Sequence, residues 1–132
     1  MVYEPDVVIG ELFKNETRID TALSPKIISY KMTLFVDDII VGSLIGNYNI
    51  DAFSPYIQEW NKNGVLDLIE IEEIYQGKGY GTLFLYVYIG FMKKIGAIQI
   101  SAKKQRYDEK LVKFYSQFGF EIENRDMVLK FG

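Results

Sequence analysis

The sequence predicts a single α/β domain in which helices pack on a mixed β-sheet. Its 132 residues suffice for one hydrophobic core. Hydrophobic residues make up 48% and charged residues 25% of the chain, a balance that is typical of folded proteins. Several segments with strand patterns surround two segments with helical patterns, and this order predicts a sheet covered by helices. We therefore expect residues 1–132 to form one domain with one site.

The first third of the chain is predicted to be mostly strand. Val2 to Phe13 contains one candidate strand, and Lys14 to Pro25 is polar enough for a loop or a short helix. Ile27 to Val36 and Ile39 to Gly46 are rich in β-branched and aromatic residues. They flank Asp37-Asp38, so a β-hairpin is predicted there.

The segment from Asn47 to Asn63 has no clear period. Three of its aromatic residues lie three and four positions apart, which fits a short amphipathic helix that begins near Pro55. These residues are Phe53, Tyr56 and Trp60. Together with Tyr48 they could form the wall of a binding pocket, although core packing or a dimer contact would use the same residue types.

The rest of the chain alternates between strand and helix patterns. Gly96 and Gly119 follow the two helical segments, where a left-handed glycine commonly ends a helix. Asp108 can cap the second helix. The predicted elements are the strand Val65 to Ile71, the helix Thr82 to Ile95, the strand Ala97 to Ala102, the helix Asp108 to Phe118, and a hairpin of Phe120 to Glu123 with Met127 to Phe131.

The residue types that the chain lacks exclude several kinds of chemistry. It contains no cysteine and no histidine, so disulfides, thiolate zinc sites, cysteine nucleophiles and Ser-His-Asp relays are excluded. We expect no metal cofactor. No apolar run reaches membrane-spanning length, and Met1 to Gly10 lacks a secretory signal pattern, so we expect a soluble, cytoplasmic protein that does not enter a membrane.

Charge is distributed unevenly along the chain. Residues 1–73 carry thirteen acidic and five basic side chains, whereas residues 74–132 carry five acidic and ten basic ones. Such a split indicates one half that faces an anion and one that faces a cation, although surface charges also cluster by chance. The net charge of −3 argues against nucleic-acid binding.

A glycine-rich turn lies between the predicted strand that ends at Ile71 and the predicted helix that begins at Thr82. Its sequence is Gln76-Gly77-Lys78-Gly79-Tyr80-Gly81-Thr82. Unpaired main-chain N–H groups at a helix start, with the positive end of the helix dipole, can bind a phosphate, and glycines leave room for its approach. Lys78 adds a mobile positive charge. The glycine spacing fits neither the P-loop motif GxxxxGK[ST] nor the dinucleotide-binding motif GxGxxG. A turn that needs positive φ angles for structural reasons alone would also contain glycine.

Two motifs resemble those of the GNAT superfamily of acyl-CoA-dependent N-acyltransferases. Gln76-x-x-Gly79-x-Gly81 is similar to the family's Q/R-x-x-G-x-G/A signature, which also follows a strand and opens a helix. Lys113 to Phe120, KFYSQFGF, is similar to the family's second signature, a helix that ends in FY-x-x-x-GF. The resemblance implies a mixed, mainly antiparallel central sheet with helices packed on both faces, here with a shortened N-terminal helical region.

The resemblance also implies an acetyltransferase that moves an acetyl group from acetyl-CoA to a primary amine by direct attack in a ternary complex. The acceptor would be a small molecule or a peptide. The aromatic segment and the short N-terminal region separately suggest that the chain could form a homodimer. A catalytically inactive CoA-binding or protein-interaction module on the same fold is the alternative.

Each residue of the implied site has a role that the resemblance suggests and a structural alternative. Tyr115 would protonate the departing thiolate, or be a core aromatic. Glu70, or else Glu72, would deprotonate or attract the ammonium, or be a polar residue of a half-exposed strand. Asp108 would contact the cofactor arm, or only cap a helix. The remaining cofactor contacts would come from Ile69, Glu70, Ile71, Gln76, Gly77, Lys78, Gly79, Tyr80, Gly81, Thr82 and Tyr115.

Overall fold

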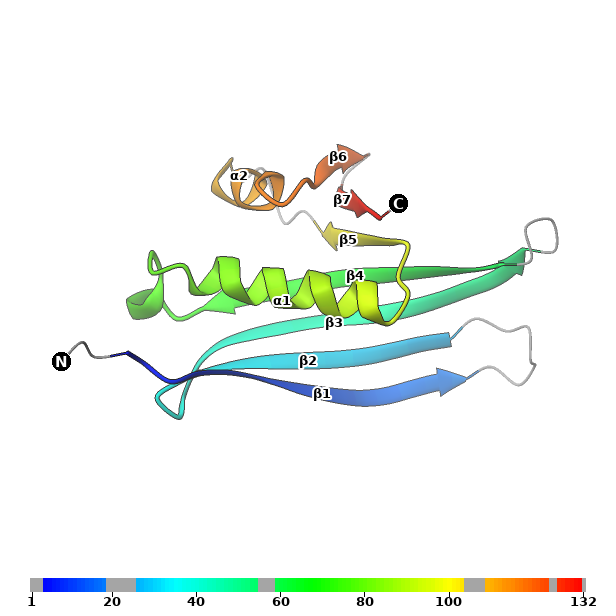
Figure 1. The fold of residues 1–132 in the computed structure, drawn as a ribbon. Coiled ribbons are helices and arrows are strands. Elements are labelled where there is room, and N and C mark those ends of the chain that lie inside the picture. Colours follow the sequence, from blue (N-terminus) through cyan, green and yellow to red (C-terminus); the bar gives the residue numbers. More distant parts are fainter. Residues whose placement is uncertain (1–3, 19–25, 55–58, 104–108, 124–125, 132) are drawn as a thin grey trace.

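A seven-stranded β-sheet forms the centre of the computed structural model, which describes residues 4–18, 26–54, 59–103, 109–123 and 126–131 (Figure 1). The strand order is β1-β2-β3-β4-β5-β7-β6. In chain order the elements are β1 (Val7–Arg18), β2 (Lys26–Val36), β3 (Ile39–Ser54), β4 (Glu59–Ile71), the 3₁₀ turn η1 (Glu73–Tyr75), α1 (Tyr80–Lys94), β5 (Gln99–Lys103), α2 (Glu109–Ser116), β6 (Glu121–Glu123) and β7 (Asp126–Lys130).

The first four strands form an antiparallel meander, and β4 pairs with β5 in parallel. β2 and β3 meet at Asp37 and Asp38, whose φ angles are 50° and 65°. Two consecutive positive φ angles are the geometry of a tight hairpin turn, and short acidic side chains tolerate it. The predicted hairpin and the predicted mixed, mainly antiparallel sheet are therefore confirmed.

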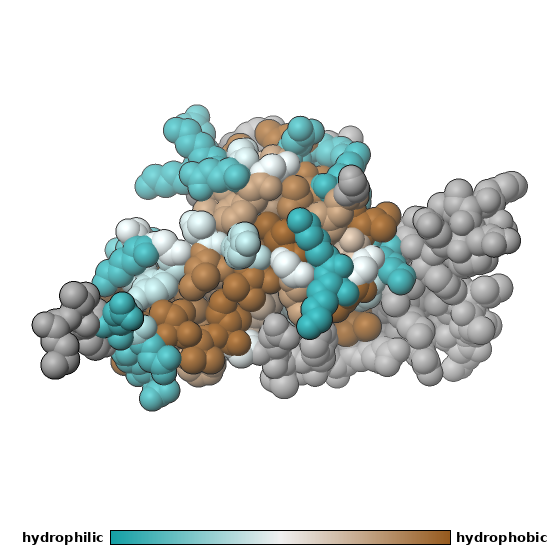
Figure 2. All heavy atoms as spheres, in the orientation of Figure 1, coloured by the Kyte–Doolittle hydropathy of each residue, from teal (hydrophilic) through white to brown (hydrophobic). Residues whose placement is uncertain are grey.

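α1 crosses the sheet over β3 and β4 (Figure 1) and supplies a large part of the core. Its buried residues pack against apolar side chains of β2, β3 and β4. The buried residues of α1 are Phe84, Leu85, Tyr88, Ile89 and Met92. Figure 2 shows groups of hydrophobic side chains on the face that carries α1, with hydrophilic side chains between and around them. None of the described helices is long and apolar enough to cross a membrane.

Two predictions for the first half of the chain were wrong. β1 continues to Arg18, so the part of Lys14 to Pro25 that the structure describes before β2 is strand, and residues 19–25 lie outside the described part. The helix expected around Phe53 and Trp60 is replaced by strand, because β3 reaches Ser54 and β4 begins at Glu59. The main chains of Phe53 and Trp60 are cross-strand partners. Hydrogen-bonded pairing with a neighbouring strand here outweighs the helix that the local spacing of the aromatic residues favours.

Candidate active site

The glycine-rich turn leads into α1 with its main-chain amides exposed. Gly77 and Gly79 have φ angles of 75° and 86°, and Gly79 is the left-handed N-cap of α1, without any side-chain cap. The first helical hydrogen bond runs from the amide of Leu83 to the oxygen of Gly79 at 3.1 Å. Within the described part of the chain, no protein acceptor takes a hydrogen bond from the amides of residues 77–82. The helix start thus exposes amides that can bind an anion, and we call residues 77–82 the anion site.

The space around this turn is also open. A Cβ atom built on Gly77 or Gly79 would meet nothing within 4 Å. Lys78 Nζ lies 5.6 Å from the centre of the Tyr75 ring, a cation–π distance that keeps the charge beside the turn. The first turn of α1 carries no acidic residue. Positive potential from the helix dipole and Lys78 therefore meets no opposing charge on the helix itself.

β4 and β5 separate partway along β4. They pair only through residues 63–66 of β4. The register between β3 and β4 shifts at Gly46, which leaves Asp67 as an extra residue in a β-bulge. Beyond the bulge, residues 68–71 pair with β3 alone among the described strands. This unpaired edge of β4, which we call the free edge, can accept an extended ligand as an added strand.

The alternation of main-chain groups decides which residues face the free edge. The amide of Glu72 donates to the oxygen of Val41 at 2.8 Å, so the main chains of Glu72 and Glu70 face β3. The main chains of Ile69 and Ile71 then face the free edge. Of the three strand residues that were predicted to contact the cofactor, Ile69 and Ile71 thus turn their main chains to the free edge, and Glu70 turns its main chain to β3.

Three adjoining pockets surround the end of β4 and all include Ile71 and Gln76. The first, of about 230 Å³, lies at the glycine turn. The second, of about 380 Å³, lies between β4 and α2 and includes Lys110 and Phe114. The third, of about 480 Å³, lies between residues 40–43 of β3 and 69–72 of β4. Because the pockets share residues, they adjoin one another around the end of β4, and we call the three together the groove.

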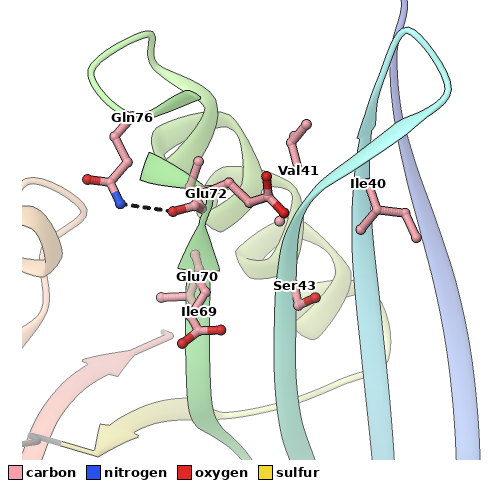
Figure 3. Close-up of a pocket in the computed structure, with 9 residues that line it drawn as sticks. Ile40, Val41, Ser43, Ile69, Glu70, Glu72 and Gln76 are labelled. Atoms are coloured by element: carbon pink, nitrogen blue, oxygen red, sulfur yellow. Dashed lines mark hydrogen bonds between the residues drawn. The ribbon is translucent and has the colours of Figure 1, made fainter. Parts of the chain in front are cut away.

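The third pocket, shown in Figure 3, carries the two predicted carboxylates. Glu70 and Glu72 are exposed and line it, whereas Ile69 and Ile71 pack against the core, as strand alternation predicts. The side chain of Glu72 reaches from the end of β4 toward β3 in Figure 3. No lysine or arginine of the described chain lines this pocket, whereas Lys110 lines the second one. Two acidic side chains thus line the third pocket and one basic side chain lines the second.

Tyr115 lies in the core beside the groove. Its side chain is 4% exposed and packs against Phe120 and Phe114, with ring centres 5.2 and 5.6 Å away. Burial raises the pKa of Tyr115 to about 12. Its neighbour Phe114, and not Tyr115, lines the first two pockets. Sequence reasoning missed Phe114 as a lining residue, although it belongs to the second motif and α2 has a strongly one-sided apolar face.

The remaining expected residues are placed as follows. Tyr48 is buried, and its hydroxyl donates to the oxygen of Ile95 at 3.1 Å, so it supports the end of α1 and does not line the three pockets. Asp108 and Tyr56 lie outside the described residues. Among those described, no group of three or more carboxylates could hold a metal ion.

Comparison with known proteins gives one family. The chain matches the profile of the Acetyltransferase (GNAT) family over residues 13–120. A search of curated protein sequences gives no match. Solved structures with a similar fold include Naa50 from Arabidopsis thaliana in complex with the bisubstrate analogue CoA-Ac-MVNAL, with a TM-score of 0.60, 22% identity, and coverage of 76% of this chain and 72% of that chain.

Two further structures have a similar fold. PaiA N-acetyltransferase from Thermoplasma acidophilum in complex with coenzyme A has a TM-score of 0.57 and 20% identity, and the match covers 78% of this chain and 61% of that chain. An acetyltransferase of the GNAT family from Streptococcus pneumoniae has a TM-score of 0.64 and 19% identity, and the match covers 79% of this chain and 67% of that chain. At these identities the likeness shows a shared fold.

Proposed function

The chain belongs to the GNAT family of acetyltransferases, and on that basis we propose that it transfers an acetyl group from acetyl-CoA to a primary amine by direct attack in a ternary complex. The observation that carries the proposal is the open anion site of residues 77–82 beside the free edge of β4. Naa50 and PaiA were solved with a CoA bisubstrate analogue and with coenzyme A, which supports the same donor here.

The groove can hold the parts of the donor in order. The diphosphate would bind the amides of residues 77–82, where the helix dipole and Lys78 favour negative charge. The extended pantetheine arm would pair with Ile69 and Ile71 along the free edge, as an added strand does. One of the amides on this edge would donate to the thioester oxygen and stabilise the negative charge that develops there.

Proton transfer would use Tyr115 on one side of β4 and the carboxylates on the other. Burial raises the pKa of Tyr115 to about 12, so its phenol is protonated at neutral pH. It is a weaker acid than a thiol of reference pKa about 8.5, so its proton would move to the thiolate only within a preorganised site. Glu70 is the proposed base and Glu72 the second choice, acting on the ammonium through water or by attraction. Both line the third pocket, which makes this pocket the proposed acceptor site.

The acceptor in this proposal is a cationic amine, small or peptidic. Naa50 was solved with a peptide-containing analogue and the NatC complex with a Gag peptide, which supports a peptide N-terminus as one acceptor class. Ile40 is 56% exposed and lines the same pocket, so it offers an apolar contact to the group next to the amine.

The test measures acetyl-CoA binding by calorimetry and CoA release across a panel of primary amines. We expect acetyl-CoA to bind and at least one amine class to be acetylated. Tyr115→Phe should lower kcat by about 10²-fold or more while the Kd for CoA changes little, because it removes only the acid. Tyr86→Phe, an exposed tyrosine of α1, is the control and should behave as wild type.

The alternative is a module that binds CoA or a protein without catalysis. It is motivated by the N-terminal region, because among the described residues no helix lies between β1 and β2. CoA binding without turnover of any amine would favour this alternative. A lack of CoA binding at millimolar concentration would contradict both functions.

A further inference from the structure

Two buried tyrosines meet where β4 and β5 separate. Tyr30 of β2 and Tyr88 of α1 share a hydrogen bond between their hydroxyl oxygens, and their ring centres are 5.7 Å apart. Tyr30 is 3% exposed and Tyr88 is fully buried. The Tyr30 hydroxyl also donates to the main-chain oxygen of Val65 in β4 at 3.4 Å. The pair therefore joins β2, α1 and β4 at one point.

This point lies at the root of the free edge. Val65 and Leu66 are the last residues of β4 that pair with β5, and Asp67 of the bulge follows directly. The direction in which residues 67–71 leave the paired part of the sheet depends on how β4 is held here. That direction sets the position of the Ile69 and Ile71 amides.

A glycine in β3 makes this arrangement possible. A Cβ atom on Gly46 would lie 2.3 Å from the oxygen of Val65 and 2.6 Å from the hydroxyl oxygen of Tyr30. Such distances are far inside van der Waals contact, so the Tyr30 side chain can cross β3 to reach Val65 only above a glycine. The contact between Tyr30 and β4 is thus specified jointly by Tyr30 and Gly46.

A second set of polar contacts holds the bulge. The Asn47 side-chain amide donates to Asp67 Oδ2 at 3.0 Å, and the Ser29 hydroxyl donates to Asn47 Oδ1 at 2.8 Å. Ser29 and Asn47 are cross-strand neighbours of β2 and β3. These contacts act on the bulge residue itself, whereas the tyrosine pair acts two residues earlier. The two sets together fix β4 before and at the start of its free edge.

We propose that Tyr30 and Tyr88 are positioning residues for acetyl transfer, and that their hydroxyl pair fixes the spacing between α1 and the free edge of β4. This inference rests on the proposed function, because α1 would hold the diphosphate and β4 the thioester. Donor affinity depends on many contacts along the groove. Rate depends on a β4 amide meeting the developing oxyanion, and small displacements there are costly.

The test compares Tyr88→Phe with Tyr48→Phe. Each substitution removes one buried hydroxyl from a hydrogen bond and keeps the ring, but the Tyr48 hydroxyl bonds to Ile95 at the other end of α1. We expect Tyr88→Phe to lower kcat by about tenfold or more and to change the Kd for CoA by less than about threefold. Tyr48→Phe should keep wild-type kcat. Equal kcat values in the two variants would overturn the proposal.

A readout without turnover separates this proposal from the proposed function. In amide spectra by NMR, Tyr88→Phe should shift the resonances of residues 67–71, and Tyr48→Phe should not. If the wild type acetylates no amine, the proposed function fails, and the spectra still decide the positioning role. Unshifted β4 amides in Tyr88→Phe overturn it. Should Tyr88→Phe fail to fold, Tyr30→Phe removes the partner hydroxyl and takes its place.

Discussion

The side-chain amide of Gln76 donates a hydrogen bond of 2.9 Å to the main-chain oxygen of Ile71 (Figure 3). This bond closes the segment between the end of β4 and the glycine turn, with η1 inside it. It also satisfies an acceptor on the free edge of β4 and leaves the amides of Ile69 and Ile71 available. The glutamine that begins the first motif therefore has a structural role in placing the turn beside the strand.

Gln76→Ala should weaken CoA binding by about two- to tenfold, because one hydrogen bond contributes roughly 0.5–1.5 kcal/mol and its loss lets the turn move. Calorimetric titration with CoA measures the effect. Gln117→Ala, at an exposed glutamine after α2, is the control and should bind as wild type. Equal affinity in all three proteins would show that Gln76 does not place the turn.

Gly79→Ala should abolish most CoA binding, with at least about a tenfold rise in Kd. Its φ of 86° costs an alanine about 1–2 kcal/mol, and its Cβ would occupy space at the anion site. Gly96→Ala places the same strain, at a φ of 93°, at the far end of α1. Both variants should lose similar stability in urea unfolding, but Gly96→Ala should bind CoA normally. A matching loss of affinity in Gly96→Ala would assign the effect to strain alone.

The buried tyrosines predict a loss of stability at alkaline pH. Burial raises the pKa of Tyr30, Tyr88 and Tyr115, the last to about 12 from 10.0. A raised pKa favours the folded state below pH 10, and this contribution is lost as pH rises through the folded-state pKa. The free energy of unfolding should therefore fall above pH 10, and Tyr115→Phe should reduce that fall by about 2 kcal/mol near pH 12. Urea unfolding at increasing pH measures this fall. Titration of all tyrosines near pH 10 in a protein that stays folded would contradict the prediction.

Gly46→Ala should destabilise the protein by about 1–3 kcal/mol, because its Cβ would collide with Tyr30 and the main chain of Val65. Gly90→Ala is the matched contrast, since a Cβ there meets nothing within 4 Å on the exposed side of α1. It should stabilise the protein by about 0.5–1 kcal/mol through helix propensity. Thermal unfolding of both variants checks the opposite signs. A Gly46→Ala protein as stable as the wild type would show that Tyr30 can relocate.

Local signals were sufficient for some elements and insufficient for others. The hairpin at Asp37 and Asp38, the glycine turn and α1 were predictable because short-range residue chemistry specifies turns and helix starts. The strand extensions of β3 and β4 beyond Asn47 were not. They exist because each strand supplies the other's hydrogen-bond partners, a relation between residues distant in the chain.

Some features of the candidate site could likewise be predicted from the sequence and others could not. The residues of the glycine turn could be predicted from the residue types that open a helix. The alternation of Glu70 with Ile69 could be predicted from the two-residue period of a strand. The exposure of Phe114 to the groove and the burial of Tyr115 could not. Adjacent residues on a short helix differ in environment only through what packs against them.

The sequence by itself determined that a glycine-rich turn leads into α1 and that acidic and basic residues occupy different halves of the chain, because both can be read from the order of the residues alone. Only the tertiary structure decided that β4 has a free edge, that Tyr30 and Tyr88 meet at its root, and that the acidic pocket shares Ile71 and Gln76 with the pocket at the glycine turn. These features arise where strands from distant parts of the chain pair, separate and pack against a helix, and no local pattern encodes such distances.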